Sequence, residues 1–357
     1  MLPTRMRAML LTGHGDVTAL EYRTDVPVPE PARGEVLVRV KAAAVNNTDI
    51  NLRTGWYSKV AAEPSGPPPD GTFTAADAGW TGTPVVFPLI QGADACGEIV
   101  AVGGGIPSTR LGERVLIDPV LRPPASAPAA PMRYLGSDCP GAFAEYVAVP
   151  AVNAVPVRSS LSDAELASFP CSYTTAENLL TRARVSADDT VLVTGASGGV
   201  GAAAVQLAHR RGSRIIAVAA AAKAPAIQAL GAAEVVARGE DLEARLRGQR
   251  IDVVIDVVGG PAFPALLGIL TPGGRYAVAG AIGGPVVALD LRTLYLKDLS
   301  MYGCTIPDPA VFTSLVRYIE QGEIRPLVAK TFALRDLAAA QEAFLEKAHV
   351  GKIVALT

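Results

Sequence analysis

A glycine-rich turn between a strand and a helix is the strongest chemical signal in this sequence. The run Val191-Leu-Val-Thr-Gly-Ala-Ser-Gly-Gly-Val-Gly201 begins as an apolar strand and leads into an alanine-rich stretch with helical spacing. Gly198 and Gly201 would let the backbone approach a pyrophosphate at the helix start, where unpaired N–H groups and the helix dipole favour anions. In this context the turn predicts a dinucleotide site rather than a purely structural turn. The residues expected to contact the dinucleotide are Ala196, Ser197, Gly198, Gly199, Val200 and Gly201.

The second predicted strand, residues 214–218, indicates which dinucleotide binds. Folds specific for NAD usually place Asp or Glu at the end of this strand, where it accepts from the ribose 2′-hydroxyl. Here the strand runs into alanines and Lys223, and no acidic residue occurs between Gly201 and Glu234. Lys223 and Arg238 could neutralise a 2′-phosphate, so we expect NADPH as cofactor. The alternative for Lys223 is a solvated lysine at the start of a helix.

The same turn also fits Thr194-Gly-x-x-x-Gly199-x-Gly201, the pattern with which short-chain dehydrogenases begin. In this chain the motif lies in mid-sequence, and no Tyr-x-x-x-Lys follows it. The stretch before residue 191 is too long for a linker and long enough for a separate domain. These facts argue against a short-chain dehydrogenase.

Composition limits the classes of partner. Half of the 357 residues are hydrophobic, 18% are charged, and the formal net charge is −2. Without a run of Lys or Arg the chain offers little to a nucleic acid or an anionic membrane, so we expect neither as a partner. The absence of a signal-like N-terminus and of long apolar segments predicts a cytoplasmic protein. Four scattered cysteines without a C-x-x-C indicate neither a disulfide framework nor a structural zinc site.

The order of predicted elements divides the chain. Residues 6–60 alternate in the short bursts typical of β-rich, barrel-like structure, and Pro-, Gly- and Ala-rich segments at 61–84 and about 121–133 are predicted loops. From residue 161 helices and strands alternate, as in a parallel α/β sheet. The predicted helices are 163–185, 199–211, 223–231 and about 335–347, and the predicted strands are 190–194, 214–218, 234–237, 251–256, 274–278 and 351–356.

Several motifs in order resemble the medium-chain dehydrogenase/reductase superfamily over essentially the whole chain. Besides residues 191–201 they are Ala42-Ala-Ala-Val-Asn-Asn-Thr-Asp49, the stretch 91–103, Gly112-Glu-Arg-Val115, Gly141-Ala-Phe-Ala-Glu-Tyr146 and Gly351-Lys-Ile-Val354. The resemblance implies an α/β fold in which a Rossmann domain, a doubly wound parallel sheet, spans residues 157–305. Residues 1–156 and 306–357 would form a β-rich, GroES-like catalytic domain.

This sequence departs from the zinc alcohol dehydrogenases of that superfamily at the metal positions. Those enzymes carry Cys-His where this chain has Asn46-Asn47, and Gly-His-Glu where it has Gly92-Ala93-Asp94. Of the three ligand positions only Cys171 keeps a side chain able to bind zinc, whereas a catalytic zinc needs three protein ligands. We therefore expect an enzyme without a metal.

The stretch from Asn46 to Tyr57 is similar to two metal-free branches, the quinone oxidoreductases and the 2-enoyl thioester reductases. In the latter the tyrosine that matches Tyr57 is the proposed proton donor, and lining the cleft is its alternative role here. In quinone reductases a lysine at the position of Lys223 faces the 2′-phosphate. The insertion at 61–84 is not typical of quinone reductases.

Metal-free reduction is easiest for an α,β-unsaturated carbonyl, because the negative charge spreads onto the carbonyl oxygen. The Asn46 amide could stabilise that oxygen, and Tyr57 could deliver a proton as general acid. Asn46 as a turn residue and Asp49 as a helix cap are the structural alternatives. The expected catalytic residues are Tyr57, Asn46 and Asp49. Further residues expected at the cofactor are Thr175, Val258, Gly259, Gly280 and Lys352; for Lys352 the alternative is a surface lysine.

We thus predict an NADPH-dependent, zinc-independent reductase of quinones or activated double bonds. The alternatives are a zinc-type alcohol or carbonyl dehydrogenase, a 2-enoyl thioester reductase and a catalytically silent NADPH-binding protein. A reductase of carrier-bound acyl chains would need a basic patch, for which Arg182, Arg184, Arg210 and Arg211 are candidates. The apolar strand near residues 299–303 predicts a homodimer.

Overall fold

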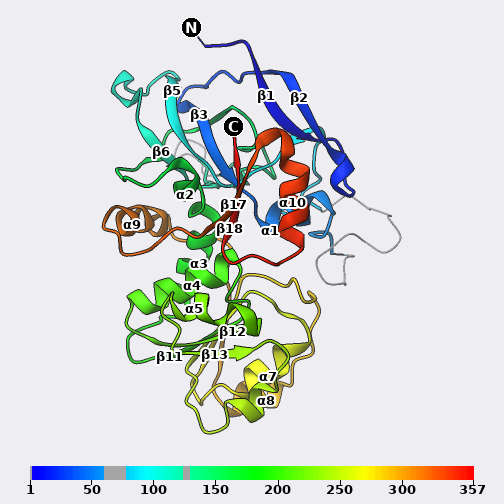
Figure 1. Ribbon diagram of the computed structural model, residues 1–357, viewed down its shortest axis with the longest axis vertical. Helices are drawn as coiled ribbons and strands as arrows, with labels where there is room; N and C mark the ends of the chain where they lie inside the picture. The colour runs from blue at the N-terminus through cyan, green and yellow to red at the C-terminus, as the bar shows by residue number, and fades with distance from the viewer. Residues whose placement is uncertain (1, 60–77, 124–128) are drawn as a thin grey trace.

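Two sheets organise the protein in a computed structural model that describes residues 2–59, 78–123 and 129–357. A parallel sheet lies at the bottom of Figure 1, and a mixed sheet that contains strands from both ends of the chain lies at the top. Most of the predicted loop at 61–84 and part of that near 121–133 lie outside the described residues. The two sheets confirm the predicted fold class, which is a Rossmann sheet beside a β-rich unit.

The parallel sheet has the strand order β13-β12-β11-β14-β15-β16, which is the order of the dinucleotide-binding doubly wound fold. Its strands are β11 (Thr190–Val193), β12 (Arg214–Ala219), β13 (Glu234–Ala237), β14 (Val253–Asp256), β15 (Arg275–Val278) and β16 (Ser300–Gly303). The helices in this part of the chain are α3 (Pro170–Arg182), α4 (Gly199–Arg210), α5 (Ala224–Gln228), α6 (Leu242–Arg245), α7 (Phe263–Gly268), α8 (Leu291–Leu296) and α9 (Pro309–Glu320).

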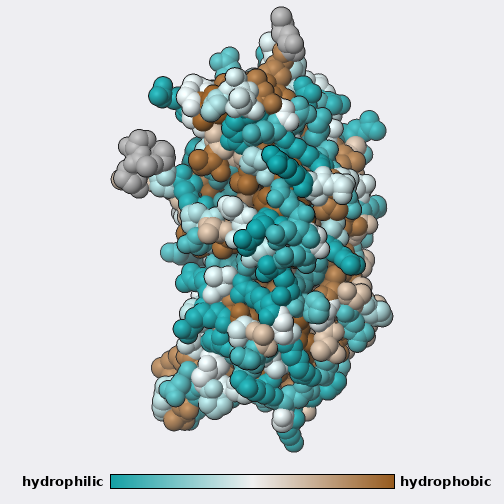
Figure 2. All heavy atoms as spheres, turned by 90° about the vertical axis from the view of Figure 1, so that its left-hand side faces the viewer, coloured by the Kyte–Doolittle hydropathy of each residue, from teal (hydrophilic) through white to brown (hydrophobic). Residues whose placement is uncertain are grey.

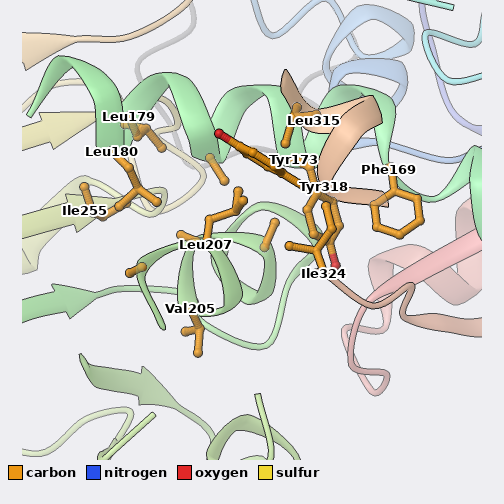
Figure 3. Close-up of a cluster of buried hydrophobic side chains, with 14 of the residues drawn as sticks. Phe169, Tyr173, Leu179, Leu180, Val205, Leu207, Ile255, Leu315, Tyr318 and Ile324 are labelled. Carbon is orange, nitrogen blue, oxygen red and sulfur yellow. The ribbon is translucent and has the colours of Figure 1, made fainter. Parts of the chain in front are cut away.

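Side chains on the parallel strands alternate between two apolar clusters. Val191 and Val193 belong to a cluster with α3, α4 and α9, whereas Leu192 between them belongs to a cluster with α6 and α7. Figure 3 shows part of the first cluster, with Leu179 and Leu180 on α3 and Leu207 on α4. Burial on both faces explains why these strands are continuous apolar runs.

The predicted helix at 163–185 is wrong in one respect, because two helices occupy this region. The helix α2 (Asp163–Ala167) ends before α3, which begins at Pro170. Proline has no backbone N–H and is tolerated at the first position of a helix, but not in its interior. Pro170 therefore separates the two helices, and Ser162 caps the first through its side chain.

The mixed sheet has the order β10-β6-β5-β3-β18-β17, with β9 also paired to β3. Its strands are β3 (Glu35–Ala44), β5 (Cys96–Val102), β6 (Arg114–Ile117), β9 (Tyr146–Pro150), β10 (Ala154–Pro156), β17 (Val328–Ala333) and β18 (Lys352–Leu356). The smaller elements are β1 (Arg5–Leu11), β2 (Leu20–Pro27), β4 (Leu89–Ile90), β7 (Val120–Leu121), β8 (Arg133–Tyr134), α1 (Asn47–Arg53) and α10 (Leu337–Leu345). Antiparallel pairing of Val354 with Ala44 brings the end of the chain beside the turn before α1.

The surface seen in Figure 2 is mostly hydrophilic, with apolar residues interspersed. None of the helices in the described ranges is long and apolar enough to cross a membrane.

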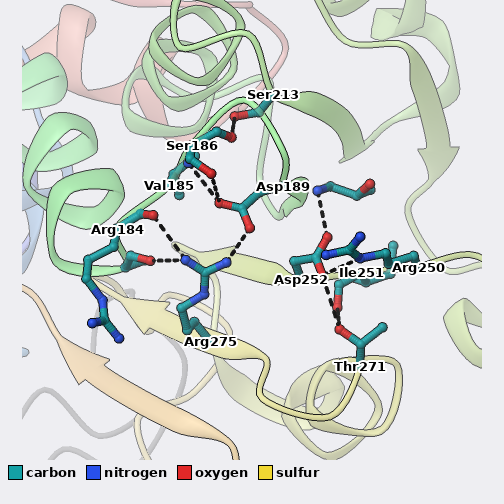
Figure 4. A network of polar contacts seen from close by, with 12 residues as sticks. Arg184, Val185, Ser186, Asp189, Ser213, Arg250, Ile251, Asp252, Thr271 and Arg275 are labelled. Atoms are coloured by element: carbon teal, nitrogen blue, oxygen red, sulfur yellow. Dashed lines mark hydrogen bonds and ion pairs between the residues drawn. The ribbon is translucent and has the colours of Figure 1, made fainter.

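Arg275 connects the parallel sheet to the segment between α3 and β11 (Figure 4). Its guanidinium pairs with the carboxylate of Asp189 and donates to the carbonyl oxygens of Ala183 (2.8 Å) and Arg184 (3.0 Å). Asp189 also accepts from the backbone N–H of Ser186 at 2.8 Å. Both charged side chains are largely buried, so the loss of either leaves the other buried without its opposite charge.

We expect Arg275→Met to lower the free energy of unfolding by about 3 kcal/mol, because it leaves the Asp189 carboxylate buried without its cation. Urea denaturation monitored by circular dichroism measures this change. The matched control is Arg292→Met, which breaks an exposed pair with Asp290 and should cost less than about 1 kcal/mol. Equal effects of the two substitutions would contradict the role assigned to Arg275.

Candidate cofactor cleft and catalytic site

A cleft of about 550 Å³ runs along the carboxyl ends of the parallel strands and is bordered by residues of both sheets. In a doubly wound sheet this edge is where ligands bind. The predicted site residues that line it are Asn46, Ser197, Gly198, Gly199, Val200, Gly201, Lys223, Arg238, Val258, Gly259 and Lys352. Most of the residues that the sequence predicted at the cofactor therefore lie around one cavity.

The glycines of the turn have different structural roles. Gly198 is the N-cap of α4, and a Cβ atom there would meet only the Gly195 oxygen at 3.5 Å. A Cβ at Gly201 would instead lie 2.3 Å from the Gly195 oxygen, so glycine at this position is required by the tight turn. A Cβ at Gly199 would lie 2.9 Å from the Lys352 Cδ atom. Space for a pyrophosphate at the helix start is thus provided at Gly198, and the other two glycines serve packing.

Basic side chains gather where β12 ends. Lys223, Arg238, Lys347 and His349 all border the cleft. The Lys223 ammonium donates to the carbonyl oxygens of Lys347 (2.6 Å) and His349 (2.7 Å), so this lysine is bonded to the segment after α10 rather than simply solvated. Burial and the neighbouring Lys223 lower the pKa of Lys347 to about 8. Glu240 and Asp241 also line this end, but Asp241 is engaged as the N-cap of α6.

A buried carboxylate shapes the loop after β14. Asp256 accepts from the Thr194 hydroxyl (2.5 Å), the Val258 backbone N–H (2.9 Å) and the Tyr276 hydroxyl (2.6 Å). Gly259 follows with φ +65°, a conformation that favours glycine. The loop thus presents Val258 and Gly259 to the cleft, while the Asp256 oxygens are occupied by protein donors.

Lys352 forms a buried ion pair beside the glycine turn. Its ammonium donates to Asp94 Oδ2 at 2.9 Å and to Asn46 Oδ1. Lys352 is 3% exposed and Asp94 is fully buried, which excludes the surface position considered for Lys352. The second Asp94 oxygen accepts from the backbone N–H of Cys171 at 2.6 Å. Asp94 was not expected among the site residues, although its sequence position corresponds to a carboxylate in the zinc enzymes.

The Asn46 side chain is hydrogen-bonded to both members of the Lys352–Asp94 pair, so its amide is not free to bind a substrate. Its Nδ2 group donates to Asp94 Oδ2 (2.8 Å) and to the Ala44 carbonyl oxygen (3.2 Å), which uses both amide hydrogens. The proposed oxyanion donor at Asn46 is therefore not present in this arrangement. Asp49 accepts from the Asn46 backbone N–H at 2.7 Å, as in a capping box of α1. Burial raises the pKa of Asp49 to about 7, and its position is that of a helix-capping residue.

Tyr57 lies near Asp49 and Cys171 but is not among the described residues that line the cleft. It is half-buried, and burial raises the pKa of its hydroxyl to about 12, although hydrogen bonds with Thr48 and Asn51 lower it. The charges of Cys171 and Asp49 act on the same hydroxyl. A tyrosine with this pKa remains protonated at neutral pH and keeps a proton that it can donate.

Three predicted cofactor residues do not border the cleft. The Thr175 hydroxyl donates to the Cys171 carbonyl oxygen (2.8 Å) within α3, and the backbone N–H of Ala196 donates to Val218 (3.1 Å). Gly280 lies close to the Val257 backbone, where a Cβ would approach its oxygen to 2.8 Å. Conversely, Lys347 and His349 were missed, because a basic residue after a predicted helix carries no signal of what it faces.

The zinc site of the alcohol dehydrogenases does not fit these residues. Ala93 offers no donor, and Asn46 already accepts from the Lys352 ammonium, a cation that would repel a metal ion. Burial raises the pKa of the Cys171 thiol to about 12, and the Tyr134 hydroxyl donates to its sulfur at 3.2 Å. Among the described residues no group of three His, Cys, Asp or Glu side chains could hold a metal ion.

Family models match both parts of the chain. The alcohol dehydrogenase GroES-like domain matches residues 32–159, and the zinc-binding dehydrogenase model matches residues 199–321. A crystal structure of a proposed alcohol dehydrogenase from Sinorhizobium meliloti 1021 is 47% identical, with a TM-score of 0.88 over 99% of this chain and 97% of the other.

Two enzymes that reduce different substrates are also similar. The acryloyl-coenzyme A reductase of Metallosphaera sedula is 29% identical over 99% of this chain and 100% of its own length. The quinone oxidoreductase of Rattus norvegicus is 25% identical over 98% of both chains. The similarity thus covers whole chains.

Proposed function

This chain belongs to the medium-chain dehydrogenase/reductase superfamily, and we propose that within it the protein is an NADPH-dependent, zinc-independent reductase of activated C=C bonds or quinones. The observation that carries the proposal is the Lys352–Asp94 ion pair at Asn46, where zinc relatives have a metal ligand. Without a metal, simple ketones are hard to reduce, whereas an α,β-unsaturated carbonyl or a quinone can spread the charge that hydride addition creates. The relatives named acryloyl-coenzyme A reductase and quinone oxidoreductase support this substrate class.

The cofactor preference rests on charge at the adenosine end of the cleft. When bound, a nicotinamide cofactor supplies the hydride. Lys223, Arg238 and Lys347 would bind a 2′-phosphate. Burial and, after it, the neighbouring Lys223 lower the pKa of Lys347 to about 8, and a 2′-phosphate beside these side chains would favour their charged forms. This charge supports a preference for NADPH over NADH.

Acyl carriers and coenzyme A thioesters need separate consideration. Two of the arginines considered as a docking patch are already paired, Arg210 with Glu323 and Arg211 with Glu177. These ion pairs weaken the case for a macromolecular carrier as substrate. They do not bear on a free enoyl thioester, which belongs to the same chemical class as an enone.

The proposed activity is tested by NADPH consumption with a panel of enones, quinones and enoyl thioesters in the presence of a metal chelator. We expect turnover of at least one compound, with kcat/KM about tenfold higher for NADPH than for NADH, since a charge-assisted contact contributes about 1.5–3 kcal/mol. Lys223→Met should reduce this preference and leave NADH turnover within about threefold. Binding of NADPH without turnover of any compound would favour a silent binding protein instead, and inhibition by the chelator would contradict zinc independence.

Tyr57→Phe should lower kcat for an enone about 100-fold, because a general acid typically contributes about 10²–10⁴-fold. The KM for NADPH should not change. Since the pKa of Tyr57 is raised to about 12, its hydroxyl stays protonated as pH rises from 6 to 9, so the wild-type kcat should show no loss of this donor in that range. Tyr22→Phe, on β2, is the matched control. Full activity of Tyr57→Phe would show that Tyr57 is not the proton donor.

We also propose a homodimer formed through the outer edge of the parallel sheet. Among the described residues the strand β16 pairs only with β15, and several large apolar side chains in the segments before and within it are exposed, as unprotected sheet edges rarely are. They are Val286, Leu291, Tyr295, Leu296 and Met301. Light scattering should give the mass of two chains, and Met301→Lys should shift it towards one. A single-chain mass at all concentrations would rule out this assembly.

A further inference from the structure

The side chain of Tyr134 joins two of the positions at which the zinc enzymes have metal ligands. Its ring belongs to one apolar cluster with Ala93 and Val120. Its hydroxyl donates to the Cys171 sulfur at 3.2 Å. Because Ala93 has no side chain beyond Cβ, the tyrosine ring fills space at a position where the zinc enzymes carry a histidine. The Tyr134 hydroxyl therefore lies among the residues that surround the metal ion in those enzymes.

Tyr134 is fixed in this place through its ring and its backbone. Trp80 stacks on the ring, with the ring centroids 4.3 Å apart and the ring planes at 23°. The backbone N–H of Tyr134 donates to the Asp138 carboxylate at 2.8 Å, and the backbone N–H of Trp80 donates to the Ser137 hydroxyl at 3.1 Å. A hydroxyl on a fixed ring stabilises charge without reorganisation at the moment the charge forms.

The hydrogen bond from Tyr134 to Cys171 is a weak one that a better acceptor can replace. Sulfur is a poor acceptor. Burial raises the pKa of the Cys171 thiol to about 12, so the sulfur stays protonated and uncharged at neutral pH. Burial also raises the pKa of the Tyr134 hydroxyl well above its ordinary value, so this group keeps its proton. A carbonyl or enolate oxygen beside Cys171 would therefore accept from Tyr134 in place of the sulfur.

The Tyr134 hydroxyl lies near the proposed proton donor and near residues of the cleft. The charges of Asp94 and Tyr57 both act on it. Asn46, which donates to Asp94 at 2.8 Å, and Ser172 line the cleft. Tyr134 itself is 5% exposed, so water competes little for its hydroxyl. A substrate that enters along Asn46 and Ser172 therefore brings its oxygen towards a donor that is shielded from water.

We propose that Tyr134 is a catalytic residue that takes the place of the metal by donating a hydrogen bond to the carbonyl oxygen of the substrate. Trp80 is a positioning residue that fixes the ring. The inference rests on the proposed function, because it assumes a conjugated carbonyl or a quinone as substrate. Tyr134 supplies the donor that Asn46 cannot provide, since both amide hydrogens of Asn46 are used within the protein. A hydroxyl stabilises negative charge less than a metal ion does, so it suits substrates that spread this charge.

The proposed step balances as follows for an enone. The substrate receives hydride at its β-carbon, where a new C–H bond forms. The electron pair of the C=C bond shifts to give an enolate, and the enolate oxygen accepts from the Tyr134 hydroxyl. A proton from Tyr57, replaced from water, then forms the C–H bond at the α-carbon. The product is the saturated carbonyl compound, the cofactor is left oxidised by two electrons, and Tyr134 keeps its own proton.

The test is the carbonyl stretching frequency of cinnamaldehyde bound together with NADP⁺, measured by infrared difference spectroscopy with ¹³C at the carbonyl. A hydrogen bond to the oxygen weakens the C=O bond and lowers this frequency relative to that in an apolar solvent. We expect the lowered frequency in the wild-type protein and its loss in Tyr134→Phe. The same substitution should lower kcat for cinnamaldehyde about 10²-fold, as the loss of one oxyanion donor does, while the Kd for NADPH stays within about threefold.

The matched control is Tyr173→Phe, because Tyr173 is another buried tyrosine, whose hydroxyl donates to the Arg325 carbonyl oxygen at 2.7 Å. It should keep the lowered frequency and the wild-type kcat. Cys171→Ala removes the sulfur that accepts from Tyr134 and should also keep the lowered frequency. Circular dichroism checks that each variant is folded. If Tyr134→Phe is not, Trp80→Leu replaces it and should weaken the shift, because the ring is then no longer fixed.

Three results would overturn the inference. One is a frequency in the wild-type protein that equals the value in an apolar solvent. Another is a lowered frequency that persists in Tyr134→Phe, since the donor would then be a different group. The third is a loss of the shift in Cys171→Ala, which would assign the hydrogen bond to the thiol.

The two proposals can fail separately. If Tyr134 lowers the carbonyl frequency but the protein reduces no compound of the panel, the proposed function is wrong and the polarising role of Tyr134 stands. If the protein reduces enones and Tyr134→Phe does so at the wild-type rate, the proposed function stands and the role of Tyr134 is wrong.

Discussion

The ion pair between Lys352 and Asp94 is the interaction around which the cleft is arranged. Removing two charges from water costs several kcal/mol, so such a pair persists only when further hydrogen bonds satisfy it. Here those bonds come from the Asn46 side chain and the Cys171 backbone N–H. The four residues belong to the start of β18, the connection between β4 and β5, the turn before α1 and the start of α3. One buried pair thus fixes the relative positions of four distant segments.

This constraint changes the interpretation of the glycine turn. A glycine-rich turn is usually explained by the close approach of a phosphate, and Gly198 provides that space here. Gly199, in contrast, is needed because the Lys352 side chain passes where its Cβ would be, and Ser172 Oγ would lie 2.6 Å from the same atom. A single motif therefore borders the cleft at Gly198 and makes room for the Lys352 side chain at Gly199.

Relatives with the same fold carry names that imply different substrates, from alcohols to quinones and acyl thioesters. A fold shared over whole chains does not decide among these chemistries, because function depends on the groups at the site. In this protein Asn46, at a position where the zinc enzymes have a metal ligand, accepts from the buried Lys352 ammonium.

The sequence by itself determined the parallel α/β sheet and most of the residues that line the cleft. These features depend on local patterns, since the strand-to-helix turn and the apolar runs of β11 to β14 are each encoded within a few neighbouring residues. It also indicated that a zinc site would be incomplete, because Ala93 cannot bind a metal in any fold.

Only the tertiary structure decided what the polar residues near Asn46 do. Lys352 and Asp94 lie 258 positions apart, and nothing in the surroundings of either residue signals that they are paired. Antiparallel pairing of β18 with β3 brings the lysine to this place, and once it is there both hydrogens of the Asn46 amide are used within the protein. The role of a buried charge depends on its partners in space, and those partners are set by the packing of distant segments rather than by local sequence.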